Sequence, residues 1–140
     1  MTPGGPSWAL MHSEPRRPAT GLMARDVPEE PGVYAWYRGG IPVYVGKADD
    51  LRDRAWKRHM GQGRTLRTSA FRRNVAEHLG FGSANDLLQG MVVLDPSALA
   101  SVRKWILGCE LGWIVCATPA AAISLERRMK AEFLPLLTKR

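Results

Sequence analysis

Hydrophobic positions after residue 31 follow regular patterns that predict a β-hairpin. Residues 32–37 (Gly-Val-Tyr-Ala-Trp-Tyr) and 41–45 (Ile-Pro-Val-Tyr-Val) are rich in β-branched and aromatic residues, which is typical of strands. Gly39 and Gly40 lie between them and supply the positive φ values that a tight hairpin turn needs. Pro42 has no N–H to donate, so we expect the second strand to be an edge strand or to begin irregularly.

Helical spacing and capping residues predict the later elements. A helix is expected over residues 51–60, with Asp50 as its N-cap and Asp53 at its third position. A second helix is expected over residues 69–79, where Phe71, Val75 and Leu79 form a buried stripe. The pattern further predicts a short helical stretch over residues 83–89, a helix over 96–107, a third strand over 111–116 and a last helix over 119–133.

This order of elements predicts an α/β mixture around a small sheet. The 140 residues suffice for one domain with one core. Frequent proline and glycine interrupt any periodicity in the first thirty residues. We therefore expect a flexible tail over residues 1–20 and an ordered lead-in over residues 21–31.

Composition excludes several classes of protein. Apolar residues make up 45% of the chain and charged residues 24%, which is ordinary for a globular protein. No apolar run is long enough for a membrane-spanning helix, and the first residues lack the pattern of a secretory signal. Two cysteines, Cys109 and Cys116, are too few for a disulfide framework or a four-cysteine zinc site. We expect a cytoplasmic protein without a membrane partner.

The net charge of +7 points to a polyanionic partner, nucleic acid first. Residues 32–80 hold ten basic and four acidic residues, a local excess of +6. A solvated helix face is the alternative explanation, but such faces usually mix the two signs. The residues expected to face phosphates are Lys47, Arg52, Lys57, Arg58, Arg64, Arg67, Arg72 and Arg73.

Four side chains in the predicted elements form a candidate site. Tyr34 and Tyr44 lie on the two paired strands, where alternation allows both to face one side of the sheet. Arg54 follows Tyr44 by ten residues, on the first predicted helix. Glu126 falls on the apolar stripe of the last helix, and an inward carboxylate is costly unless it is paired or binds a cation.

The ordered set Gly32-Val33-Tyr34, Tyr44-Val45-Gly46-Lys47, Leu51-x-x-Arg54 and the late Glu126 resembles the catalytic domain of the GIY-YIG nuclease superfamily. The resemblance covers about residues 31–138. It implies a three-stranded antiparallel sheet flanked by helices, with a nuclease domain over residues 21–140. It also implies a metal-dependent endonuclease that hydrolyses phosphodiester bonds in DNA. The sequence itself does not exclude RNA as the substrate.

The resemblance also assigns roles to individual residues. Tyr34 corresponds to the general base or water-positioning tyrosine, and Tyr44 shapes the site of the nucleophile. Arg54 would stabilise charge on the scissile phosphate, and Glu126 would be the one protein ligand of a divalent ion, Mg²⁺ or Mn²⁺. Lys47 would lower the pKa of a tyrosine or bind a phosphate oxygen. Because an unperturbed tyrosine has a pKa of about 10, we expect nearby cations to lower it.

Two positions depart from the family pattern. Many members have His or Tyr four residues after the arginine, where this chain has Arg58, with His59 one residue later. On an α-helix, Arg58 lies about 40° around the axis from Arg54 and His59 about 140°, so His59 reaches the site only if the helix adapts. The family's late asparagine is replaced by Thr138.

Other assignments stay open at this point. A nucleic-acid-binding module that has the fold but little or no cleavage activity is the main alternative, and a protein-interaction domain is the third. Asp49, Asp50 and Asp53 are explained by helix capping rather than by a metal site. The spacing of Cys109 and Cys116 matches no common zinc site. The pattern does not specify the target sequence, the biological role or the oligomeric state.

Overall fold

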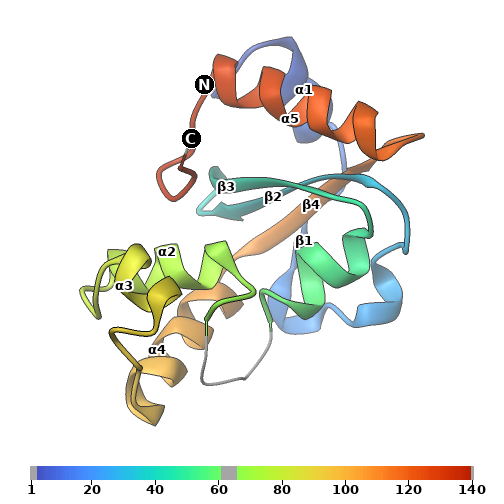
Figure 1. The fold of residues 1–140 in the computed structure, drawn as a ribbon. Helices are drawn as coiled ribbons and strands as arrows, with labels where there is room; N and C mark the ends of the chain where they lie inside the picture. The colour runs from blue at the N-terminus through green and yellow to red at the C-terminus, as the bar shows by residue number, and fades with distance from the viewer. Residues whose placement is uncertain (1–2, 61–65, 140) are drawn as a thin grey trace.

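An antiparallel sheet with helices on both faces forms the centre of the computed structural model, which describes residues 3–60 and 66–139 (Figure 1). The strands run in the order β1-β4-β2-β3. Their bounds are β1 (Arg17–Pro18), β2 (Gly32–Arg38), β3 (Ile41–Ala48) and β4 (Glu110–Val115).

The helices separate into two layers. One face of the sheet is covered by α1 (Pro6–His12) and α5 (Pro119–Glu132), which pack on Val33 and Ala35 (Figure 1). Tyr34 and Trp36 alternate to the opposite face, in a second core cluster. The elements on that side are η3 (Arg52–Lys57), α2 (Ala70–His78), α3 (Ala84–Gln89) and α4 (Pro96–Leu107). Two single turns, η1 (Ala19–Gly21) and η2 (Ala24–Asp26), precede the hairpin.

The sheet has four strands rather than the three expected. The three predicted strands are present as β2, β3 and β4, and all pairings are antiparallel. The additional strand is β1, whose Arg17 and Pro18 pair with Leu111 and Glu110 of β4. A strand of two residues is too short to show alternation of polar and apolar positions, so the sequence pattern did not predict β1. The α+β character is as predicted.

The hairpin follows the expected turn chemistry. Gly39 and Gly40 have φ values of 59° and 80°, which favour glycine. Pro42 pairs with Tyr37 directly beside a shift in the β2–β3 register, and β3 is an edge strand. The irregular start and the edge position that were expected for this strand from Pro42 are therefore both present.

The C-terminal segment lies along the edge of β3. The Leu137 N–H donates to the Val43 carbonyl at 2.9 Å, and the Thr138 hydroxyl accepts from the Val45 N–H at 2.9 Å. The Asn74 side-chain amide donates to the Leu137 carbonyl at 2.8 Å. Thr138 therefore acts on the backbone of β3, and its side chain is buried there.

Replacing Thr138 with valine is expected to lower the free energy of unfolding by about 1–3 kcal/mol, because the buried Val45 N–H loses its acceptor. Urea denaturation measures the change. The exposed Thr20 provides the control, and Thr20→Val is expected to stay within about 0.5 kcal/mol of the parent. Equal stabilities of the two variants would contradict the structural role of Thr138.

The N-terminal segment is not the flexible tail that its composition suggested. Residues 6–12 form α1, in which Trp8 and Met11 are fully buried against α5. The Trp8 indole N–H donates to the Met129 carbonyl at 2.8 Å. The Glu132 carboxylate accepts from the backbone N–H groups of Gly5, Ser7 and Trp8. Because Glu132 lies far from α1 in the sequence, the composition of the first thirty residues could not predict this cap.

Four of the five predicted helical segments, α2 to α5, lie within a residue of their predicted bounds. The exception is residues 51–60, where a π-helical turn, η3, replaces an α-helix. Its Asp50 carboxylate still accepts from the Asp53 N–H at 3.2 Å, as expected of a capping residue. Among the described helices, none has the length and apolar character needed to cross a membrane.

Candidate active site

Tyr34 and Tyr44 lie side by side on the face of the sheet that carries η3 and α2. Their ring centroids are 6.2 Å apart, and their exposed fractions are 1% and 9%. Tyr34 pairs across the strands with Gly46, where a Cβ atom would lie 2.5 Å from the Tyr34 hydroxyl oxygen. Gly46 therefore leaves the space in which the Tyr34 ring crosses to the edge of the sheet.

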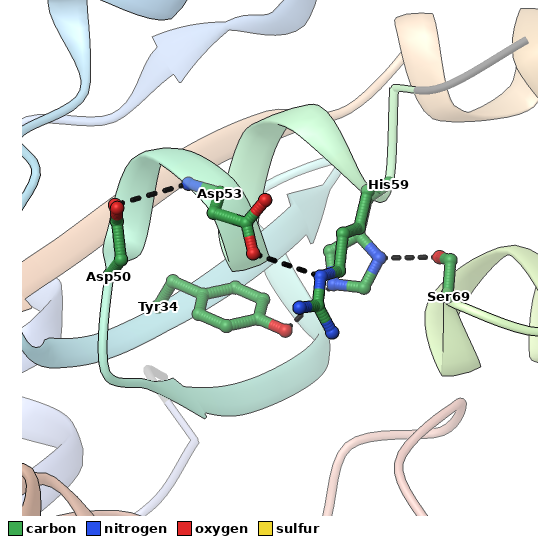
Figure 2. A network of polar contacts seen from close by, with 6 residues as sticks. Tyr34, Asp50, Asp53, His59 and Ser69 are labelled. Atoms are coloured by element: carbon green, nitrogen blue, oxygen red, sulfur yellow. Dashed lines mark hydrogen bonds and ion pairs between the residues drawn. The ribbon is translucent and has the colours of Figure 1, made fainter.

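The π-turn brings His59 to the tyrosines. The Arg58 N–H donates to the Asp53 carbonyl, five residues earlier, at 3.0 Å. This wider turn changes the angular position of each following residue, so His59 points into the site and its Nε2 lies 2.7 Å from the Tyr34 hydroxyl (Figure 2). The Arg58 side chain forms an ion pair with Asp53 at 3.0 Å. The ideal α-helical angles that placed Arg58 nearer to the site do not apply.

His59 is neutral at physiological pH in this setting. Its side chain is buried, which lowers its pKa to about 3. Burial is the largest cause of this lowering, and the positive charges of Arg54, Arg58, Arg72 and Arg73 also contribute to it. A neutral imidazole has one donor and one acceptor nitrogen, so His59 can orient the Tyr34 hydroxyl but does not offer it a positive charge.

The tyrosine pKa values move opposite to the expected direction. Burial raises the pKa of Tyr34 well above its ordinary value and outweighs the opposing effect of Arg54. Burial also raises the pKa of Tyr44, while hydrogen bonding with Tyr34 and the charges of Arg54 and Arg73 lower it. The expectation that cations would dominate is therefore wrong for both residues, because desolvation is the larger effect.

Arg54 projects from η3 toward solvent beside this cluster. Arg54 is exposed, and its positive charge lowers the pKa values of Tyr34, Tyr44 and His59. A guanidinium in this position presents several donors to an oxyanion that approaches from solvent.

Glu126 approaches the same strand edge from α5. Its side chain is 12% exposed, and its Oε1 lies 3.3 Å from the Lys130 ammonium nitrogen one helical turn later. It forms part of the wall of a cavity of about 390 Å³, and its negative charge acts on both tyrosines. The residues that line this cavity are Lys47, Ile123, Glu126, Arg127, Lys130 and Ala131.

The donor set at this cavity suits a hydrated Mg²⁺ or Mn²⁺ ion. Within residues 3–60 and 66–139, no cluster of three or more His, Cys, Asp or Glu residues could bind a metal ion. Mg²⁺ commonly binds through one or two carboxylates and retains several waters, which a single carboxylate on an open cavity allows. Glu126 fits that description, although the Lys130 ammonium competes for its charge.

The predicted phosphate-binding residues divide into two groups. Lys47, Lys57 and Arg67 are exposed on the surface. Three others bind groups of the protein itself: Arg52 binds Glu29 and the Val27 carbonyl, Arg58 binds Asp53, and Arg73 binds the carbonyls of Leu66 and Arg67. Arg72 is buried. Arg64 lies outside the described residues.

Ser69 and Lys130 were missed in the sequence as residues of the site, and Gly46 was named in the motif without a role. Ser69 contacts His59, Gly46 accommodates the Tyr34 ring, and Lys130 pairs with Glu126. The four-residue spacing of Glu126 and Lys130 was available as a signal for an ion pair. Nothing in the ten-residue spacing of His59 and Ser69 indicated their contact.

No family model matches the chain. A curated relative is the UvrABC system protein C of Deinococcus radiodurans, which is 34% identical over 67 residues, 48% of this chain. The match extends over only 10% of that relative, so the chain corresponds to a small part of a much longer protein.

Solved structures that resemble the chain include GIY-YIG N-terminal endonuclease domains of UvrC from Thermotoga maritima. A tyrosine-to-phenylalanine point mutant bound to its catalytic divalent cation is 21% identical, with 84% of this chain and 96% of that chain covered and a TM-score of 0.45. A second structure, bound to magnesium, is 23% identical over 81% of this chain and 93% of that chain, with a TM-score of 0.39. The curated relative and these solved structures are all UvrC proteins.

Proposed function

We propose that this chain is a divalent-metal-dependent endonuclease of the GIY-YIG type that hydrolyses phosphodiester bonds in DNA. The observation that carries the proposal is the convergence of Tyr34, Tyr44 and Arg54 at the edge of β3, with Glu126 approaching from the opposite layer. The similarity to the UvrC proteins supports a nuclease. The local excess of basic residues supports a nucleic-acid substrate.

In the proposed reaction, Tyr44 removes the proton from the attacking water. Tyr44 is the better base of the two tyrosines because it is less buried and because hydrogen bonding with Tyr34 lowers its pKa. Tyr34, fixed by His59, orients the Tyr44 hydroxyl and the water. This assignment exchanges the two roles that the family resemblance implied.

The cationic residues act on the phosphate. Arg54 binds the non-bridging oxygens of the scissile phosphate and stabilises the charge that develops there. Lys47, on the cavity wall, binds a phosphate oxygen of the backbone. The exposed Lys57 and Arg67 extend the positive surface along the strand.

Glu126 would hold the divalent ion through its carboxylate. A bound Mg²⁺ or Mn²⁺ supplies positive charge that stabilises the transition state and the leaving oxygen. Before the ion binds, Lys130 neutralises Glu126 and so keeps a largely buried carboxylate from being unpaired.

Replacing Lys130 with methionine is expected to tighten Mn²⁺ binding about two- to fivefold, because the ion no longer displaces an ammonium group from Glu126. Isothermal titration calorimetry measures the affinity. Arg128→Met removes an equal charge from an exposed position of the same helix and is the matched control. Identical affinities for the two variants would contradict the competition.

Conversion of supercoiled plasmid to open circles tests the proposed activity. We expect nicking in the presence of Mg²⁺ or Mn²⁺ and none in excess EDTA. Absence of nicking with either ion would contradict the proposal.

A DNA-binding module without efficient cleavage is the second candidate. The raised pKa of both tyrosines and the pairing of Lys130 with Glu126 are the observations that favour it. This candidate predicts salt-sensitive retention of DNA that Glu126→Ala leaves unchanged, with no nicking under any metal condition. Loss of both retention and nicking at low salt would instead favour a protein-interaction domain.

A further inference from the structure

Ser69 links the cluster of Tyr34, Tyr44 and His59 to the start of α2. The residue is fully buried, and its hydroxyl oxygen accepts from the Arg72 N–H at 3.0 Å, as the N-cap of the helix. The same oxygen is a hydrogen-bond partner of His59 Nδ1 (Figure 2). One buried hydroxyl thus serves both a helix end and the histidine that holds Tyr34.

The available protons limit how this network is arranged. A serine hydroxyl has one proton to donate and two lone pairs, one of which the Arg72 N–H uses. Neutral His59 donates from one ring nitrogen and accepts at the other. Either Nδ1–H donates to Ser69 and Tyr34 donates to Nε2, or Ser69 donates to Nδ1 and Nε2–H donates to Tyr34.

The second arrangement leaves the Tyr34 proton available. In the first, the hydroxyl proton of Tyr34 is used in the bond to His59. In the second, Tyr34 accepts from His59 and its own proton can point toward the Tyr44 hydroxyl, whose ring lies 6.2 Å away between centroids. The second arrangement is favoured because the buried Ser69 hydroxyl needs an acceptor for its own proton, and among the hydrogen bonds of the described residues only His59 Nδ1 provides one.

We propose that Ser69 is a positioning residue that holds His59 in the Nε2–H tautomer, so that Tyr34 accepts from His59 and donates to Tyr44. In this arrangement hydrogen bonds are donated from Ser69 to His59, from His59 to Tyr34 and from Tyr34 to Tyr44. The effect of this arrangement on catalysis rests on the proposed function, in which Tyr44 is the base. The tautomer itself is a property of the folded protein and is independent of cleavage.

Long-range ¹H–¹⁵N correlation spectra of the histidine side chains test the tautomer in the full chain. The chain has three histidines, and a His59→Gln variant identifies the signals of His59 among those of His12 and His78. We expect the pattern of a neutral Nε2–H ring at pH 7. An Nδ1–H pattern for His59 would overturn the proposal.

Substitutions of Ser69 separate the contact with His59 from the helix cap. Ser69→Thr keeps the hydroxyl and is expected to leave the tautomer unchanged. Ser69→Asp keeps an N-cap acceptor but cannot donate when ionised, so it is expected to convert His59 to the Nδ1–H form. Ser83→Ala removes the equivalent cap of α3 and is expected to leave His59 unchanged. An Nε2–H ring that persists in Ser69→Asp would overturn the role of Ser69.

The same samples distinguish failure of this inference from failure of the proposed function. The Nε2–H tautomer in a chain that nicks no DNA would support the role of Ser69 and overturn the nuclease. The Nδ1–H tautomer in a chain that nicks DNA would overturn the role of Ser69 and support the nuclease.

Discussion

Replacing Arg54 with alanine is expected to lower the rate of plasmid nicking about a hundred- to a thousandfold. Arg54 is exposed and its charge acts on Tyr34 and Tyr44, so in the proposed reaction it would meet a phosphate that approaches from solvent. Removal of one such oxyanion donor typically costs two to three orders of magnitude in rate, that is, about 10²–10³. Single-turnover nicking with saturating Mg²⁺ measures the chemical step apart from DNA binding.

Two further variants define what Arg54 contributes. Arg54→Lys keeps the charge but not the planar set of donors, so it is expected to recover part of the rate. Arg25→Ala removes an exposed arginine of η2 and is expected to nick at the parental rate. Equal rates for Arg54→Ala and Arg25→Ala would contradict a role for Arg54 in the transition state.

The nicking rate is expected to rise about tenfold per pH unit between pH 6 and pH 9. The base must be deprotonated to act, and burial raises the pKa of Tyr44, so its active fraction is small at neutral pH and grows with pH. The groups that act on Tyr44 from the surrounding elements are Tyr34 on β2, Arg54 on η3, Arg73 on α2 and Glu126 on α5. Initial rates in buffers of constant ionic strength measure the profile.

Tyr44→Phe is expected to abolish this rise and to lower the rate at pH 8 about a hundredfold or more, because the proton acceptor is gone. Tyr37→Phe removes a tyrosine hydroxyl from the opposite face of the sheet and is the matched control. We expect Tyr37→Phe to keep the parental slope. A flat profile in the parent protein would contradict tyrosine as the base.

Local patterns predicted most of the elements correctly. Gly39 and Gly40 specify the hairpin turn, and capping residues such as Asp95 and Thr118 mark the starts of α4 and α5. Alternation on β2 and β3 was sufficient to place Tyr34 and Tyr44 on one face. These features depend on neighbours within a few residues, and that is the range over which sequence patterns carry information.

The features that the sequence did not predict depend on distant contacts. Glu132 caps α1 from the far end of the chain, so a segment rich in proline and glycine packs as a helix. His59 enters the site because η3 is a π-turn, and it contacts Ser69, which no local pattern relates to it. The pKa directions of the tyrosines depend on burial, which the count of nearby basic residues does not reveal.

The most direct test of the account is the nicking of supercoiled plasmid by the parent chain and by Glu126→Gln, with Mn²⁺ affinity measured on the same samples. Glu126→Gln keeps the size of the side chain and removes the charge of the proposed metal ligand, while Glu30→Gln makes the same change at an exposed position. We expect the parent and Glu30→Gln to bind Mn²⁺ and nick the plasmid. We expect Glu126→Gln to remain folded and do neither. Metal-dependent nicking by Glu126→Gln at the parental rate would contradict the account.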